Sequence, residues 1–299
     1  MAAPLTNVGS RTGAYGASEW GLTLVIGIIW GSAFLWIAVG VDHFSPGVVA
    51  FGRVALGAGA LAMFSRARRR IDRADWSRVF VVAVVGNAAP ALLYSTAETS
   101  LDSAVAGMVT AGVPIVSLVI AAVLLRQLPG RAQAIGITLG FVGIFMMTLP
   151  SLRGTHADPV GVGLVLLAVI GYGISGNLLV PLQQRYGGLA VTMWALVLSS
   201  FMLFPFAIAT AGESDFAMSS LVAVVILGVV GTGIVRALGA TLAGRVGAPR
   251  MSTTAYLIPV FAIVLGVVFR DEVVLPVAIV GVVVVLVGAF VATRAVTVR

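Results

Sequence analysis

The residues of this sequence that could take part in chemistry are polar and aromatic side chains within long apolar segments. They are Trp30, Ser32, Asn87, Tyr94, Met108, Thr110, Tyr172, Ser175, Asn177, Thr253 and Tyr256. Aromatic rings offer flat apolar walls and tyrosine hydroxyls add polar tips, a combination that suits an amphipathic small molecule. The amides are costly in an apolar medium unless they are bonded. The alternatives are packing or interfacial anchoring for each aromatic residue and an interhelical hydrogen bond for each amide.

Three charged residues belong to the same group of candidates. Arg236 could bind a substrate carboxylate as a two-pronged donor, although extension of its side chain towards the headgroups is the preferred alternative. Arg53 lies about two turns inside an apolar segment, where we favour a structural partner such as Asp42 over a place in a cavity. Glu98 is the best carboxylate for proton binding, but it lies at the end of its segment. A uniporter or exchanger is therefore favoured over a proton antiporter.

Features of enzymes and pumps are missing from the sequence. There is no cysteine, and the two histidines, His43 and His156, fall in predicted loops. No HExxH, Gly-Lys-Ser phosphate loop or Gly-x-Ser-x-Gly pattern occurs. We therefore expect no enzyme, no metal, no cofactor and no ATP-driven transport.

The composition places the chain in a membrane. Of its 299 residues 60% are hydrophobic and 10% are charged, and the mean hydropathy is +1.10. A soluble domain would carry about 25% charged residues. Apolar periodicity and length predict ten spans and one transmembrane domain. The predicted spans are residues 20–40, 47–65, 77–97, 102–125, 132–149, 159–181, 189–210, 219–239, 248–269 and 275–293.

The arginines set the predicted orientation. The net charge is +7, and all 18 basic residues are arginines that lie mostly in one set of alternate loops. Only Arg153 and Arg270 fall in the other set, together with most of the acidic residues. The positive-inside rule then puts both termini in the cytoplasm of a bacterium, with the chain in its inner membrane. The same placement argues against a nucleic-acid partner and leaves membrane lipids as the surroundings.

An internal repeat divides the predicted spans into two groups of five. At an offset of 145 residues, five identities share one register: Pro114 with Pro259, Gly136 with Gly281, Gly143 with Gly288, Phe145 with Phe290 and Thr148 with Thr293. An odd number of spans in each repeat, 1–150 and 151–299, makes the two repeats inverted. Inverted repeats usually hold a substrate path between them. The prolines are expected to kink their spans, and Gly136-x-x-x-Gly140 to pack a helix within the chain or in a dimer.

Four segments give the chain a resemblance to a known family. They are Tyr94–Pro114, Ala248–Pro259, Trp30–Phe34 and the acidic break Phe269–Glu272. Together they resemble the drug/metabolite transporter superfamily, EamA type, over essentially the whole chain. The first-half break, Leu125–Pro129, lacks the acidic residue usual in that family. The resemblance implies an all-α, ten-helix exporter with a central cavity, and the aromatic amino-acid exporters are its nearest match.

The sequence thus predicts an inner-membrane exporter of small amphipathic metabolites, with amino acids favoured, that works by alternating access as a monomer or homodimer. A multidrug or other metabolite efflux protein of the same fold is the first alternative. A lipid flippase or a membrane scaffold is the second. A scaffold has no need of amides and prolines at mid-depth, and a flippase needs a lateral opening to lipid.

Overall fold

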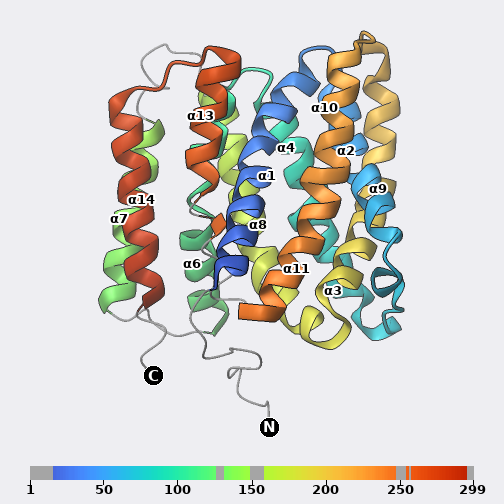
Figure 1. Cartoon of the computed structure of the whole chain (residues 1–299), viewed down its shortest axis with the longest axis horizontal. Coiled ribbons are helices and arrows are strands. Elements are labelled where there is room, and N and C mark those ends of the chain that lie inside the picture. The colour runs from blue at the N-terminus through green and yellow to red at the C-terminus, as the bar shows by residue number, and fades with distance from the viewer. Residues whose placement is uncertain (1–15, 126–130, 149–157, 247–253, 256, 295–299) are drawn as a thin grey trace.

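The computed structural model describes residues 16–125, 131–148, 158–246, 254, 255 and 257–294, and this part of the chain is helical (Figure 1). Five helical segments are long and apolar enough to cross a membrane, and five shorter apolar helices accompany them. Their number agrees with the ten predicted spans. The α-helices are α1 (Ala17–Val41), α2 (Pro46–Ala62), α3 (Trp76–Ala83), α4 (Ala89–Ala97), α5 (Ser103–Thr110), α6 (Val113–Leu125), α7 (Arg131–Thr148), α8 (Pro159–Tyr186), α9 (Gly188–Thr210), α10 (Met218–Gly228), α11 (Val235–Val246), α13 (Ile258–Arg270) and α14 (Pro276–Arg294).

Within the described residues, three of the crossings are not regular α-helices throughout. Two of them contain a π-helix, η3 (Val84–Ala88) between α3 and α4 and η6 (Val229–Ile234) between α10 and α11. In the third, α5 ends at Thr110 and α6 resumes at Val113. Short 3₁₀ turns, η1 (Ser65–Arg68), η2 (Arg73–Asp75) and η5 (Ala211–Glu213), lie in the connections.

The bundle has two distinct ends. We call the end at which α1 begins and α14 ends the N/C end, and the opposite one the far end (Figure 1). The chain alternates between them, so that α1 runs from the N/C end and its counterpart α8 runs back towards it. The two five-helix repeats therefore cross in opposite senses, as the odd number of spans in each requires.

The repeat is visible in the backbone at the predicted offset. The π-helices η3 and η6 begin 145 residues apart, at Val84 and Val229. Within η3, Asn87 Nδ2 donates to the Val82 carbonyl at 3.1 Å, five residues earlier. Within η6, Thr232 Oγ1 donates at 2.9 Å to the Leu227 carbonyl, also five residues earlier. Each repeat thus uses a polar side chain to satisfy a carbonyl next to its π-helix.

Of Pro90, Pro114 and Pro259, the last two follow a break in the helix, whereas Pro90 lies within a continuous helical segment. Pro114 and Pro259 are each the second residue of their helix, α6 and α13, while Pro90 comes just after η3 within the helical segment Arg73–Ala97. Proline lacks the amide hydrogen that a helix interior needs, whereas the first turn leaves that position unpaired. At Pro114 and Pro259 the expected kink inside a continuous helix is therefore replaced by a break after which the helix starts again. Pro90 instead lies next to the π-helix η3 inside its span.

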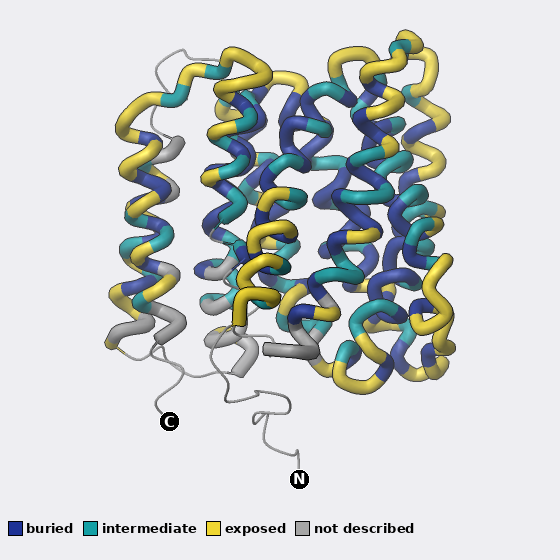
Figure 2. The backbone as a smooth tube through the Cα atoms, in the orientation of Figure 1, coloured by how far each residue is buried: buried dark blue, intermediate teal, exposed yellow. Residues whose placement is uncertain are grey.

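The outer helices carry many exposed residues (Figure 2), and large apolar side chains are among them, as contact with lipid requires. Phe201, Phe204 and Phe206 on α9 and Phe141 on α7 are exposed. The buried core instead contains small and branched residues such as Val49, Val165 and Leu227. Exposed apolar surface of this extent marks a membrane environment.

At the N/C end, Asp75, the residue before α3, binds two residues at the end of α8. Its carboxylate is 5% exposed and accepts hydrogen bonds from Arg185 Nη1 at 2.7 Å and Tyr186 Oη at 2.7 Å. Burial and the nearby carboxylates of Asp75 and Asp72 raise the pKa of Tyr186 to about 12, so the phenol stays a donor at physiological pH. Arg78 approaches the other carboxylate oxygen at 3.4 Å.

Replacing Asp75 with Ala is expected to lower the thermal unfolding midpoint in detergent by several degrees. The reason is that Tyr186 and Arg185 lose a charged acceptor, which costs roughly 2 kcal/mol. Arg78→Gln is the matched control, because that side chain is 61% exposed and its contact is long. Equal midpoints for the two variants would show that Asp75 does not hold these helices together.

Candidate substrate cavity

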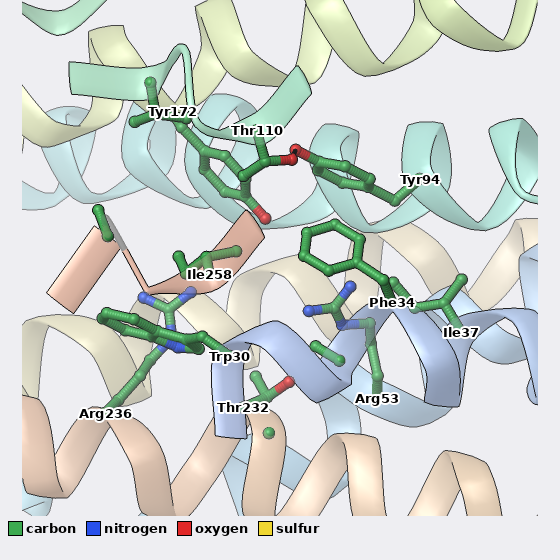
Figure 3. Close-up of a pocket in the computed structure, with 14 residues that line it drawn as sticks. Trp30, Phe34, Ile37, Arg53, Tyr94, Thr110, Tyr172, Thr232, Arg236 and Ile258 are labelled. Atoms are coloured by element: carbon green, nitrogen blue, oxygen red, sulfur yellow. Dashed lines mark hydrogen bonds between the residues drawn. The ribbon is translucent and has the colours of Figure 1, made fainter. Parts of the chain in front are cut away.

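A cavity of about 260 Å³ lies between the two repeats (Figure 3). Residues from α1, α2, α4, α5, α6, α8, η6, α11 and α13 contribute to its wall. The lining residues are Trp30, Ala33, Phe34, Ile37, Arg53, Tyr94, Thr110, Val113, Tyr172, Gly231, Thr232, Arg236, Ala255 and Ile258. Both repeats supply wall residues, so relative movement of the repeats changes the shape of the cavity.

One side of the cavity is an aromatic cluster. Tyr94 packs edge-on against Phe34, with ring centres 5.6 Å apart, and stacks on Tyr172 at 6.0 Å. Thr110 Oγ1 donates to the Ala106 carbonyl at 2.7 Å. Its contact of 2.6 Å with Tyr94 Oη therefore uses the tyrosine proton. These contacts fix the rings and present an apolar surface with a few polar atoms.

The other side of the cavity carries two arginines, whose guanidinium groups point inwards in Figure 3. Arg236 Nη2 donates to Asn87 Oδ1 at 3.2 Å, and Asn87 is itself held by its bond to Val82. Arg53 makes no hydrogen bond or ion pair within the described residues. None of the described lining residues is acidic. Two half-buried cations without a facing carboxylate make the cavity suited to an anionic ligand.

Five of the predicted site residues line this cavity: Trp30, Tyr94, Thr110, Tyr172 and Arg236. Asn87 stands behind them as the partner of Arg236. Arg236 therefore faces the cavity, and the preferred alternative of extension towards the headgroups does not describe it.

Other predicted site residues have local roles away from the cavity wall. Ser32 donates to the Ile29 carbonyl at 2.9 Å, and Met108 is buried in a core cluster. Asn177 joins α8 to α6 through the Ser117 carbonyl at 3.0 Å, which is the interhelical bond considered above. Ser175 is buried against Gly86 of η3.

Three predicted site residues remain. Glu98 lies in a separate pocket at the far end of the bundle. Thr253 and Tyr256 lie outside the described residues.

Several lining residues escaped the sequence analysis. Phe34, Ile37 and Ile258 look like any other apolar residue in a span. Arg53 was assigned a structural partner such as Asp42, but Asp42 is bound by both terminal nitrogens of Arg270, at 2.5 and 3.0 Å. Thr232 could have been found from the repeat, because it occupies the position of Asn87 at the offset of 145.

Residues 19–149 and 159–294 both match the EamA-like transporter family. The chain belongs to this family. The predicted resemblance to the drug/metabolite transporter superfamily is confirmed, and the chain is a multi-pass membrane transporter of that type. A solved structure with a TM-score of 0.65 and 16% identity covers 95% of this chain and 99% of its own, which supports the fold.

Curated relatives of this EamA-like protein also carry transporter names. A probable terminal-alkyne amino-acid exporter of Streptantibioticus cattleyicolor is 26% identical over 266 residues, 88% of each chain. An uncharacterized transporter of Archaeoglobus fulgidus is 27% identical over 63% of this chain and 67% of its own. The uncharacterized transporter YdfC of Bacillus subtilis is 23% identical over 82% of this chain and 80% of its own.

Proposed function

We propose that this EamA-like transporter exports small amphipathic metabolites from bacteria, with amino acids as the favoured substrates and aromatic ones as a refinement. The observation that carries the proposal is the pairing of two arginines with an aromatic cluster in one cavity. The probable amino-acid exporter among its relatives supports the same substrate class.

The cavity suits a molecule with one anionic end and an apolar body. A carboxylate placed between Arg53 and Arg236 would accept charge-assisted hydrogen bonds from both sides. An apolar side chain would then pack on Phe34, Tyr94 and Tyr172, where it leaves water. Cationic drugs would meet two positive charges at close range, which disfavours a broad efflux role for such compounds.

Orientation and mechanism complete the proposal. With both termini cytoplasmic in an inner membrane, the far end faces the outside. The two inverted repeats would expose the cavity alternately to each side, as a uniporter or exchanger. At the far end, Arg270 with Asp42 joins α13 to α1, and Ser45 with Ser214 joins the α1–α2 connection to the one before α10. These contacts must break when that side opens.

Counterflow in liposomes tests the proposed function. The purified protein is reconstituted, loaded with an unlabelled amino acid and diluted into a trace of the same labelled compound. We expect labelled phenylalanine, tryptophan or leucine to accumulate transiently, while amino-acid amides without a carboxylate accumulate less. Absence of counterflow for every amino acid, or a preference for cationic dyes or fluorescent phospholipids, would contradict the proposal.

A further inference from the structure

No acidic side chain reaches the substrate cavity. The chain has 11 acidic residues, all of them within the described ranges, and none lines this cavity. Each lies in the first turn of a helix, at a helix cap or in a connection: Glu19, Asp42, Asp72, Asp75, Glu98, Asp102, Asp158, Glu213, Asp215, Asp271 and Glu272. The negative side chains therefore gather at the ends of the helices, while the cavity between the repeats holds two arginines.

Glu98 is the carboxylate that follows a cavity residue most closely in the sequence. It ends α4, one helical turn beyond Tyr94, and lines a separate pocket at the far end with Ala38 and Arg270. The backbone of Ala38 and the charges of Arg53 and Arg270 act on it. Arg53 feels Glu98 only at longer range, because no ion pair joins these two side chains in the described structure. A ligand in the cavity therefore meets Arg53 without a carboxylate bound to it.

Two helices add to the positive character of the cavity because they begin at its wall. The first residue of α6 is Val113 and that of α13 is Ile258, and both residues line the cavity. The repeat offset of 145 residues relates them, so each half contributes one helix start. The first amides of a helix have no partner within it, and their partial positive charge stabilises a nearby anion. The backbone and the arginines thus favour the same sign of ligand charge.

The neutral side chains of the wall do not take the place of a carboxylate. Thr110 Oγ1 already accepts the proton of Tyr94 Oη. The ring of Tyr94 stacks on Tyr172 and meets the edge of Phe34, so part of its surface is covered. An ammonium group on a ring face gains only about 0.5–2 kcal/mol. A charged amino group in this cavity would therefore lie near two guanidinium groups with only hydroxyl oxygens and ring faces as side-chain acceptors.

We propose that the cavity prefers aromatic carboxylic acids without a charged amino group, such as 2-hydroxy and 2-oxo acids, to the corresponding amino acids. This inference rests on the proposed function and names the charge of the preferred substrate within its class of amphipathic metabolites. Both kinds of ligand can place a carboxylate between Arg53 and Arg236 and a ring on the aromatic cluster. The amino acid must also bring an ammonium group into a region of positive potential, where like charges repel. It is therefore the weaker ligand of the same site.

A matched pair of ligands tests this inference. Phenylalanine and 3-phenyllactate have nearly the same size and the same carboxylate, and a hydroxyl group replaces the ammonium group in phenyllactate. The thermal unfolding midpoint of the purified full-length protein in detergent, followed as each ligand is added, gives the two Kd values. We expect phenyllactate to bind roughly tenfold more tightly, which corresponds to about 1.4 kcal/mol. Phenylpyruvate should resemble phenyllactate, and phenylalanine amide should bind least.

The variant Arg53→Gln shows whether charge repulsion is the cause. It weakens carboxylate binding for both ligands, but it also removes part of the repulsion that the ammonium group meets. The ratio of the two Kd values should therefore fall towards one, and Arg236→Gln should have the same effect. Arg73→Gln, which removes an exposed arginine at the N/C end, should keep the wild-type ratio. Because each ratio compares two ligands on one protein, it does not depend on how much of a variant is folded.

Counterflow in liposomes keeps this inference separate from the proposed function. Labelled phenylalanine and labelled phenyllactate should both exchange, and phenyllactate should reach half-saturation at the lower concentration. If phenylalanine bound as tightly as phenyllactate, or if both Gln variants kept the wild-type ratio, the preference for acids without an ammonium group would be wrong although transport was confirmed. If neither compound bound or exchanged, the proposed function would fail and this inference with it.

Discussion

Replacing Arg53 or Arg236 with Gln should lower the rate of amino-acid transport roughly 10- to 100-fold, because hydrogen bonds to charged groups contribute about 1.5–3 kcal/mol. Both guanidinium groups enter the cavity, and no described lining residue is acidic. Arg53 has no protein partner within the described residues, so its loss should act on substrate rather than on folding. The measurement is initial counterflow in liposomes at matched protein amounts.

The control for this pair is Arg73→Gln, which removes an exposed arginine at the N/C end and should leave transport unchanged. Arg53→Lys and Arg236→Lys keep the charge but lose the planar fork, so intermediate rates are expected. If Gln variants lost as much transport of an amino-acid amide as of the free amino acid, the arginines would not be binding the carboxylate.

Arg236 also shows why the backbone matters to the site. Its guanidinium is oriented by Asn87, and Asn87 reaches Val82 because η3 widens the helix at that point. A π-helix leaves few traces in a single sequence, since its residues are ordinary apolar ones. The sequence indicates that the Asn87 amide is costly at mid-depth unless it is bonded. Its role in holding Arg236 depends on the local geometry of η3.

The number and order of the crossings could be predicted because they depend on local apolar length. The orientation that the arginines indicate stays a prediction. Which face of each helix meets the cavity could not be predicted. A helix such as α8 is apolar all round, so periodicity does not distinguish the side that meets the cavity from the side that meets another helix. Tyr172 and Asn177 were therefore equal candidates, although Tyr172 lines the cavity and Asn177 joins α6.

The assignment of Arg53 failed for a different reason. Asp42 is near it in sequence and was a reasonable partner, but Arg270, which is 228 residues away, occupies that carboxylate. Such a pairing depends on how the two repeats pack at the far end. No property of the sequence around Arg53 reveals it. The depth of the charge was informative, because a deep arginine without a local partner is a candidate for a place in a cavity, and Arg53 lines this one.

The packing of α7 on α14 explains why glycines are shared by the two repeats at Gly136 and Gly281 and at Gly143 and Gly288. A Cβ atom at Gly143 would lie 2.6 Å from the Gly281 carbonyl oxygen and 2.7 Å from the Val285 amide nitrogen. A Cβ atom at Gly288 would lie 2.7 Å from the Gly136 carbonyl oxygen and 2.8 Å from the Gly140 nitrogen. The two helices therefore approach each other at symmetry-related glycines, and Gly136-x-x-x-Gly140 packs within the chain.

Gly143→Ala and Gly288→Ala should each destabilise the protein by about 1–3 kcal/mol, since the added methyl group meets backbone atoms that cannot move aside alone. The thermal unfolding midpoint in detergent measures this loss. Gly163→Ala is the matched control, because nothing lies within 4 Å of a Cβ at Gly163 on exposed α8 surface and alanine favours helix. Because the repeat relates the two glycines, Gly143→Ala and Gly288→Ala should also have similar unfolding midpoints. If all three variants unfolded at the same midpoint, close contact between α7 and α14 would not be the reason for these glycines.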